Sequence, residues 1–270
     1  KTIGTIGEFT GNGQPWHIRM ELTEPHLPCT PHPDFAALYQ AEDIPEWGSF
    51  EESFENKPYI QKQMLYNWRL ENYTWEDWAP IVSRYYAIIT QLDDAIGRVL
   101  KALKRMGLEQ NTIVVFTSDH GDMCGGHRMI DKHYVMYEDI VKVPLIVKWP
   151  GHYEGGRTVD QFVYNLLDMV PTLLEIAGAK PPAFLQGRSL CPLLKGEAVP
   201  DWRKEVVATY NGQQFGLYTQ RMIRTDSWKY IWNTTDVDEL YNLNQDPHEL
   251  INRIHDPEQQ NRIKALRRRL

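Results

Sequence analysis

The feature that most constrains the fold is an uncharged, β-branched run that ends abruptly in a polar, glycine-rich segment. Residues 111–117 read Asn-Thr-Ile-Val-Val-Phe-Thr, and charged side chains and glycines follow at once. A continuous apolar run of this length is typical of a strand buried on both faces, as in a parallel sheet. A second run of this kind spans residues 143–149. The two runs therefore predict a buried sheet with parallel strands.

Amphipathic helical patterns flank the two predicted strands. Apolar residues recur every three or four positions over residues 82–106, after a capping-box pattern at Thr74 and Asp77. Residues 138–141 and 166–177 form two further helical segments, one before and one after the second strand. Helices that alternate with strands predict an α/β domain with crossover connections.

A change of composition near residue 180 predicts a second, smaller unit. Prolines and loop-forming residues dominate residues 180–203, and a helical pattern occupies residues 256–270. Short strand patterns lie between them at residues 205–210, 216–224 and 229–233. We therefore expect a large α/β domain over residues 1–200 and a small antiparallel sheet with a terminal helix over residues 201–270.

The N-terminal part of the chain is expected to be mostly loop. Residues 1–13, rich in Gly and Thr, predict a loop or a sheet edge, and residues 16–22 alternate enough to predict a strand. Residues 23–33 contain so many prolines that the backbone is fixed without regular structure. His26 lies between Pro25 and Pro28, so this loop would hold its side chain still.

The charge balance and the cysteine content exclude several classes of protein. Lys and Arg number 29 and Asp and Glu number 36, a net charge of −7, which argues against a nucleic-acid-binding protein. No apolar run approaches the ~18 residues that a membrane helix needs. The three cysteines are an odd number and cannot complete a disulfide framework. The chain begins at Lys1, so it is interpreted as a mature secreted protein or as a piece of a longer one.

Residues 42–77 combine a surplus of acidic side chains with many aromatic ones. We interpret the acidic side chains as part of a solvated face. The aromatic side chains either pack in a core or line a cleft for a carbohydrate, because sugars stack on such rings.

The densest group of chemically active side chains follows the first predicted strand, over residues 117–133. Asp119 and His120 stand beyond its carboxyl end, where open α/β sheets bind ligands. A carboxylate beside an imidazole is half of a divalent-metal site, and the alternative is that both only cap a neighbouring helix. Lys132 either holds an anionic ester oxygen or faces solvent. His26 is either a site residue or packs beneath its loop.

Several motifs in a fixed order resemble the second half of a type I sulfatase, a family within the alkaline phosphatase superfamily. They are Thr-Ser-Asp-His-Gly-Asp at 117–122, Gly126-His127, Lys132, Tyr137-Glu138, the apolar run with its following Pro-Gly at 143–151, Trp-Lys-Tyr at 228–230, Glu-Leu-Tyr at 239–241, and Asp-Pro-His-Glu at 246–249. The resemblance implies an alkaline-phosphatase-like sandwich with a central, mostly parallel sheet, of which this chain holds a part. It also favours a periplasmic or secreted location.

The resemblance implies roles for five residues. Asp119 and His120 match metal ligands, with Ca²⁺ favoured and Mn²⁺ or Zn²⁺ also compatible with an imidazole. Lys132 matches a lysine that contacts the sulfate, and His26 matches a histidine that contacts the sulfate and protonates the leaving oxygen. His127 is expected among the substrate contacts.

The chain departs from the family pattern at the nucleophile. That nucleophile is a formylglycine made from Cys or Ser in a Cys/Ser-x-Pro-x-Arg motif, and the segments that begin at Cys29 and Cys124 each lack part of it. The family's first pair of metal-ligating aspartates is also missing, because Asp93 and Asp94 fall within a predicted helix. We therefore expect the C-terminal portion of a sulfatase, inactive alone, whose missing N-terminal half or another chain supplies the formylglycine.

The expected activity is hydrolysis of a sulfuric ester, either a sulfated carbohydrate or an aryl sulfate. Two alternatives stay open at this point. A phosphonate or phosphodiester hydrolase of the same superfamily is compatible with Asp-His at 119 and 120, and a pseudoenzyme would keep the pocket without the nucleophile. Neither a nucleic acid nor a membrane is expected as a partner.

Overall fold

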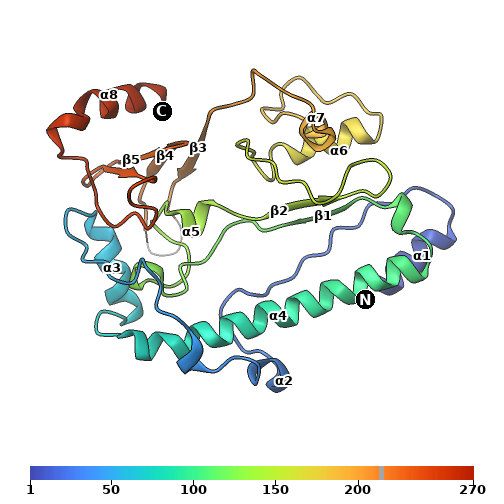
Figure 1. Cartoon of the computed structure of the whole chain (residues 1–270), viewed down its shortest axis with the longest axis horizontal. Coiled ribbons are helices and arrows are strands. Elements are labelled where there is room, and N and C mark those ends of the chain that lie inside the picture. The colour runs from blue at the N-terminus through green and yellow to red at the C-terminus, as the bar shows by residue number, and fades with distance from the viewer. Residues whose placement is uncertain (213–215) are drawn as a thin grey trace. The chain divides into compact units, whose positions relative to one another are not determined.

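The computed structural model describes residues 1–212 and 216–270 (Figure 1). These residues divide into two compact units. The first unit contains residues 1–46, 74–113 and 149–151, and the second contains residues 47–73, 114–148 and 152–270. The boundary expected at residue 200 stays a prediction. No helix in the described ranges combines the length and the hydropathy that a membrane span requires.

One long helix, α4 (Trp75–Arg105), organises the first unit. The predicted capping box is confirmed at its start, where the backbone N–H of Thr74 donates to Asp77 Oδ2 at 2.9 Å. Asp93 and Asp94 lie on an exposed face of this helix and not at a strand end. Shorter helices that contact α4 are α1 (Thr2–Gly11), α2 (Pro33–Ala36), η1 (Ala41–Asp43) and η2 (Glu109–Asn111).

The first 22 residues differ from the expectation. Residues 1–13 were expected as a loop or an edge, but most of them form helix α1, in which Ile6 is buried. Ile3, Ile6 and Phe9 recur every three residues, and this helical spacing outweighs the local Gly and Thr content. The strand predicted over residues 16–22 is also wrong, because no described strand pairs with this segment.

The second unit holds two antiparallel sheets. β1 (Val114–Thr117) pairs with β2 (Leu145–Lys148), with Val115 opposite Val147. β3 (Glu205–Tyr210), β4 (Gln220–Thr225), β5 (Trp228–Asn233) and β6 (Glu239–Asn242) form a meander in chain order. The small C-terminal antiparallel sheet is therefore confirmed, although β6 had not been predicted.

The prediction of a parallel sheet is wrong for the described residues, because β1 and β2 run antiparallel to each other. Residues 118–144 between them are long enough for a crossover, but their described helices are only the short turns η3 (Gly126–Arg128) and α5 (Glu138–Val141). Burial along β2 alternates, and Ile146 is 59% exposed, so this strand is not covered on both faces.

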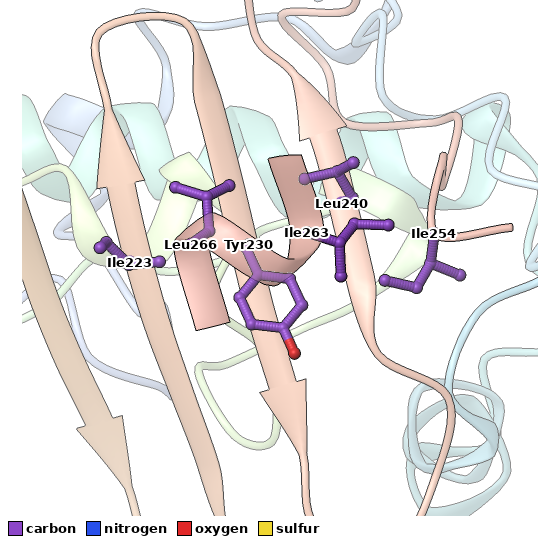
Figure 2. Close-up of a cluster of buried hydrophobic side chains, with 6 residues drawn as sticks. All are labelled: Ile223, Tyr230, Leu240, Ile254, Ile263 and Leu266. Atoms are coloured by element: carbon purple, nitrogen blue, oxygen red, sulfur yellow. The ribbon is translucent and has the colours of Figure 1, made fainter. Parts of the chain in front are cut away.

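The terminal helix α8 (Gln260–Arg269), which follows η4 (Pro257–Gln259), packs on β5. Figure 2 shows Ile263 and Leu266 of this helix beside Tyr230 of β5 and Leu240 of β6. Tyr230 and Leu240 are completely buried, so the helix and the sheet share one apolar core. The remaining helices of the unit are α3 (Tyr59–Trp68), η3 (Gly126–Arg128), α6 (Met169–Ile176) and α7 (Cys191–Lys195).

Candidate functional site

The end of β1 is fixed by a side chain from a distant part of the chain. Asn165 Nδ2 donates to the backbone oxygen of Ser118 at 2.6 Å and to Thr117 Oγ1 at 3.0 Å. Asp119 and His120 follow immediately, with side chains 76% and 34% exposed. The predicted site residues at this position are thus accessible, and the backbone that carries them is anchored.

Asp119 and His120 form a pair, and a hydrogen bond of His120 indicates the tautomer of its ring. Asp119 Oδ2 lies 3.5 Å from His120 Nε2, and His120 Nδ1 lies 2.7 Å from the backbone oxygen of Gly121. A carbonyl oxygen only accepts, so Nδ1 carries a ring proton. In this tautomer of the neutral ring Nε2 carries no proton, so Nε2 and the nearby carboxylate oxygen are two electron-rich atoms suited to a shared proton or metal ion. Histidines that bind metals commonly donate their other N–H to a carbonyl in this way.

The pair supplies two of the donors that a divalent ion needs. Two ligand atoms 3.5 Å apart match the ligand–ligand distance of a tetrahedral site with metal–ligand bonds of about 2.1 Å. Within the described ranges, no three His, Cys, Asp or Glu residues are grouped to hold a metal ion. The contacts recorded for Asp119 stay within residues 118–120, so it does not cap a helix. Metal binding by this pair stays a prediction.

The segment after this pair has an unusual backbone. Five of its non-glycine residues have left-handed φ angles, namely Cys124 (37°), His127 (49°), Arg128 (61°), Asp131 (67°) and Tyr134 (63°). Each such residue costs about 1–2 kcal/mol relative to an ordinary conformation. The segment therefore depends on contacts from elsewhere in the fold to keep its shape.

Local hydrogen bonds supply part of this support. Asp122 Oδ1 accepts from the backbone N–H groups of Cys124 at 2.8 Å and Asp131 at 3.3 Å. Burial raises the pKa of Asp122, and the charge of Asp131 adds to this effect. Arg128 donates to the backbone oxygen of Glu71 at 2.7 Å, which ties the segment to residues outside it.

Lys132 is held by the carboxylate beside it. Its Nζ lies 3.1 Å from Asp131 Oδ1, while His133 Nε2 lies 3.2 Å from Asp131 Oδ2. The Lys132 side chain is 17% exposed, whereas that of His133 is 1% exposed. Lys132 thus does not simply face solvent, and its ammonium group has a defined direction. Its contact with a sulfate stays a prediction.

His127 lies in the interior of the second unit. Its side chain is 1% exposed, its Nδ1 donates to Glu52 Oε2 at 2.7 Å, and its ring stacks on Tyr137 with centroids 3.7 Å apart. Burial lowers the pKa of His127, so the ring is neutral near pH 7. Its role as a substrate contact stays a prediction.

Sequence reasoning missed Glu52 and Lys57, which lie in the acidic stretch interpreted as a solvated face. Both side chains are 0% exposed and are joined by an ion pair of 2.9 Å. Burial raises the pKa of Glu52, but the hydrogen bond from His127 and the charge of Lys57 outweigh it and leave that pKa below its usual value. The aromatic residues around them were the available signal, because rings pack the surroundings of such a buried pair.

His26 belongs to the first unit, whereas Asp119, His120 and Lys132 belong to the second. Its side chain is exposed and does not pack beneath its loop, and its Nδ1 lies 2.9 Å from the backbone oxygen of Leu27. The backbone N–H of His26 donates to Thr23 at 3.0 Å, which closes the turn. That His26 and Lys132 share one sulfate stays a prediction.

Comparison with known families and proteins gives consistent matches. The family described as Sulfatase matches residues 5–179, and the family described as N-sulphoglucosamine sulphohydrolase, C-terminal, matches residues 125–270. An arylsulfatase of Clostridium perfringens is 33% identical over 271 residues, which cover 94% of this chain and 52% of that protein. An N-acetylglucosamine-6-O-sulfatase of Bacteroides thetaiotaomicron is 34% identical over 199 residues, covering 72% of this chain and 34% of that protein.

Solved structures agree on the fold. The structure of BT4656 in complex with its substrate D-glucosamine-2-N,6-O-disulfate has a TM-score of 0.86 at 24% identity, covering 99% of this chain and 67% of that one. The phosphonate monoester hydrolase of Agrobacterium radiobacter has a TM-score of 0.84 at 25% identity, covering 99% of this chain and 58% of that one. The chain thus has a fold of the alkaline-phosphatase-like type and spans about half the length of the Clostridium relative.

Proposed function

Because this chain belongs to the sulfatase family, we propose that it forms the C-terminal part of a hydrolase that cleaves sulfuric esters. The observation that carries the proposal is the Asp119–His120 pair, which presents two ligand atoms at the end of an anchored strand. The proposed arrangement places the large domain in residues 1–200 and the subdomain in residues 201–270.

The described residues supply part of the chemistry. Cleavage of a sulfate ester develops negative charge on the leaving alcohol, which a cation or an acid nearby stabilises. We assign Lys132 to the sulfate oxygens, with His127 as a further contact, and His26 to protonation of the leaving oxygen. A divalent ion held by Asp119 and His120, Ca²⁺ by preference, would polarise the remaining sulfate oxygens.

The nucleophile is not encoded in these 270 residues, because no Cys/Ser-x-Pro-x-Arg motif occurs in them. We propose that a formylglycine is contributed by the other half of the domain, present in the same or another chain. The sulfate ester is proposed to belong to a carbohydrate, since two relatives are named for sulfated sugars. Aryl sulfates would then be turned over as surrogates.

A phosphonate monoester hydrolase is the second candidate. The likeness to such an enzyme from Agrobacterium radiobacter favours it, as does the Asp-His pair at 119 and 120. The test is to assay the complete enzyme on 4-nitrophenyl sulfate, on a phenylphosphonate monoester and on glucosamine 6-sulfate. We expect the sulfate esters to be the better substrates by kcat/KM, and Asp119→Asn to abolish turnover. Preference for the phosphonate supports the second candidate, and no turnover supports a pseudoenzyme.

A further inference from the structure

Several motif residues have no part in the proposed chemistry, yet the fold brings them together in the interior of the second unit. Glu138 follows Lys132 closely along the chain, whereas Lys229 and Glu249 come from β5 and from the segment after β6. The side chains of Lys229 and Glu249 are 0% and 2% exposed. Charged groups are rarely buried to this extent unless they are paired.

Lys229 holds the segment before α5. Its Nζ donates to the backbone oxygen of Met136 at 2.9 Å and lies 2.9 Å from Glu138 Oε1. The same Nζ lies 2.7 Å from Glu249 Oε1. Burial raises the pKa of Glu138, but Lys229 and Arg224 outweigh it and hold that pKa below its usual value. Glu138 is therefore an anion between two cations of the C-terminal sheet.

Glu249 holds the same segment at a second point. Its Oε2 accepts the backbone N–H of Glu138 at 2.7 Å, and its own backbone oxygen accepts from Lys57 Nζ at 2.6 Å. Glu249 is itself in the left-handed region, with φ of 55°. A strained backbone at a residue that makes two such contacts indicates that the surrounding structure determines its conformation.

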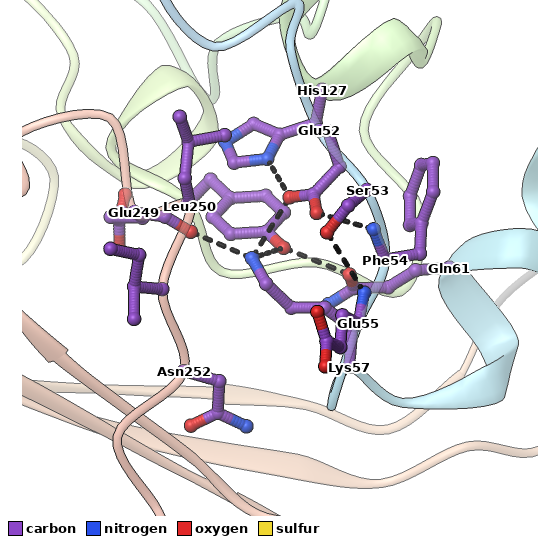
Figure 3. A network of polar contacts seen from close by, with 12 residues as sticks. Glu52, Ser53, Phe54, Glu55, Lys57, Gln61, His127, Glu249, Leu250 and Asn252 are labelled. Carbon is purple, nitrogen blue, oxygen red and sulfur yellow. Dashed lines mark hydrogen bonds and ion pairs between the residues drawn. The ribbon is translucent and has the colours of Figure 1, made fainter.

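Lys57 links this group to the loop at its other end. Figure 3 shows its ammonium group between the Glu52 carboxylate and the backbone of Glu249, with His127 on the far side of Glu52. Lys57 also donates to the hydroxyl of Tyr137 at 2.9 Å. The segment of left-handed residues is thus held by hydrogen bonds at residue 127 and again at residues 136–138, on both sides of Lys132.

We propose that Lys229 and Glu249 are positioning residues, which hold residues 136–138 and thereby fix the direction of Lys132. The effect on catalysis rests on the proposed function, whereas the holding of residues 136–138 does not. A loop with five left-handed residues relaxes when its external contacts are removed. The C-terminal sheet therefore shapes the sulfate-binding loop although it contributes no group to the reaction.

The test uses the complete enzyme with the double variant Lys229→Met/Glu249→Gln, which removes both charges and keeps the side-chain lengths. We expect hydrogen–deuterium exchange of the amides of residues 122–139 to rise at least tenfold, while the amides of β4 and β5 stay protected. We expect kcat/KM for a sulfate ester to fall at least tenfold, because a displaced Lys132 would no longer stabilise the sulfate oxygens in the transition state.

The matched control is Leu266→Ala, which destabilises the other face of the same sheet through its apolar core. Compared at equal loss of Tm, this variant should leave exchange of residues 122–139 unchanged. Equal exchange of that loop in the two variants would overturn the proposal.

If the double variant does not fold, Glu249→Gln alone, which keeps the acceptor for the Glu138 N–H, is compared in the same way. If the unaltered enzyme has no sulfatase activity, the proposed function is contradicted. Hydrogen–deuterium exchange still tests whether Lys229 and Glu249 hold residues 136–138.

Discussion

Lys57 Nζ lies 2.9 Å from Glu52 Oε2 in a place where neither side chain is exposed. Tyr137 and Tyr241 border the ammonium group, with ring centroids 4.9 and 4.7 Å away. Bulk solvent therefore does not reach the pair, and each charge depends on the other for its stability.

Lys57→Met should destabilise the protein strongly, because it leaves the Glu52 carboxylate buried without its cation. We expect a loss of about 3–5 kcal/mol in the free energy of unfolding. Chemical denaturation of the variant measures this loss. The double variant Glu52→Gln/Lys57→Met removes both charges and should recover most of it. A double variant no more stable than Lys57→Met would contradict this explanation.

The buried His127 should make stability depend on pH below neutrality. Burial holds the pKa of the folded His127 below its ordinary value of 6.5, so the unfolded chain binds a proton first as the pH falls. Stability should decrease as the pH falls from 6.5 toward the folded pKa, by up to about 1.4 kcal/mol per pH unit for one proton.

The measurement is the free energy of unfolding at several pH values, for the unaltered protein and for His127→Gln. The other carboxylates titrate alike in both proteins, so the difference between them reports the imidazole together with the Glu52 carboxylate that it contacts. Below 4.5, Glu52 should add to the loss, because its folded pKa lies below its ordinary value. Parallel pH profiles for the two proteins above 4.5 would show that folding does not lower the pKa of His127.

The ligand type at residue 120 should decide which metal binds. An imidazole suits Zn²⁺ and Mn²⁺, whereas Ca²⁺ prefers oxygen ligands. His120→Asn should weaken Zn²⁺ binding by roughly tenfold or more and leave Ca²⁺ binding nearly unchanged. Calorimetric titration of the complete enzyme with each metal checks this, and Asp119→Asn serves as the control that weakens both. Equal weakening of both metals in His120→Asn would contradict the expected selectivity.

His26→Ala should affect substrates according to their leaving groups. A poor leaving alcohol needs protonation, whereas an activated phenol leaves without it. In the complete enzyme we expect a loss of kcat of about 10²-fold or more for an alkyl or sugar sulfate and a much smaller loss for 4-nitrophenyl sulfate. Equal losses on both substrates would mean that His26 does not protonate the leaving oxygen.

The sequence predicted those parts of the fold that depend on local patterns. Local sequence patterns suffice to predict helix α4 with its capping box, the strands β3 and β5, and the single turn of α5. The orientation of β1 against β2 did not follow, because an apolar run does not specify the direction of its partner. Helix α1 was not predicted, because its glycines and threonines have low helix propensity.

The candidate site divides in the same way. Asp119, His120 and Lys132 could be selected because they follow a predicted strand within a recognisable motif. The buried Glu52 and Lys57 were not selected, because their acidic neighbours indicated a solvated face and because their burial depends on Glu249, 192 positions beyond Lys57. Only the tertiary structure shows which charges the interior retains.

This long separation has a consequence for the order in which the protein matures. Lys57 and Glu249 meet across 192 positions, and Glu138 and Glu249 across 111, so we expect both contacts to close late in folding. During synthesis the chain grows at about 5–20 residues per second, so residue 249 leaves the ribosome well after the loop that it holds. A nascent or truncated chain that stops before residue 249 therefore carries every predicted ligand of the second unit, but not the contacts that keep the loop in shape. We therefore expect the loop around Lys132 to take its final shape only after residue 249 has been synthesised and has packed.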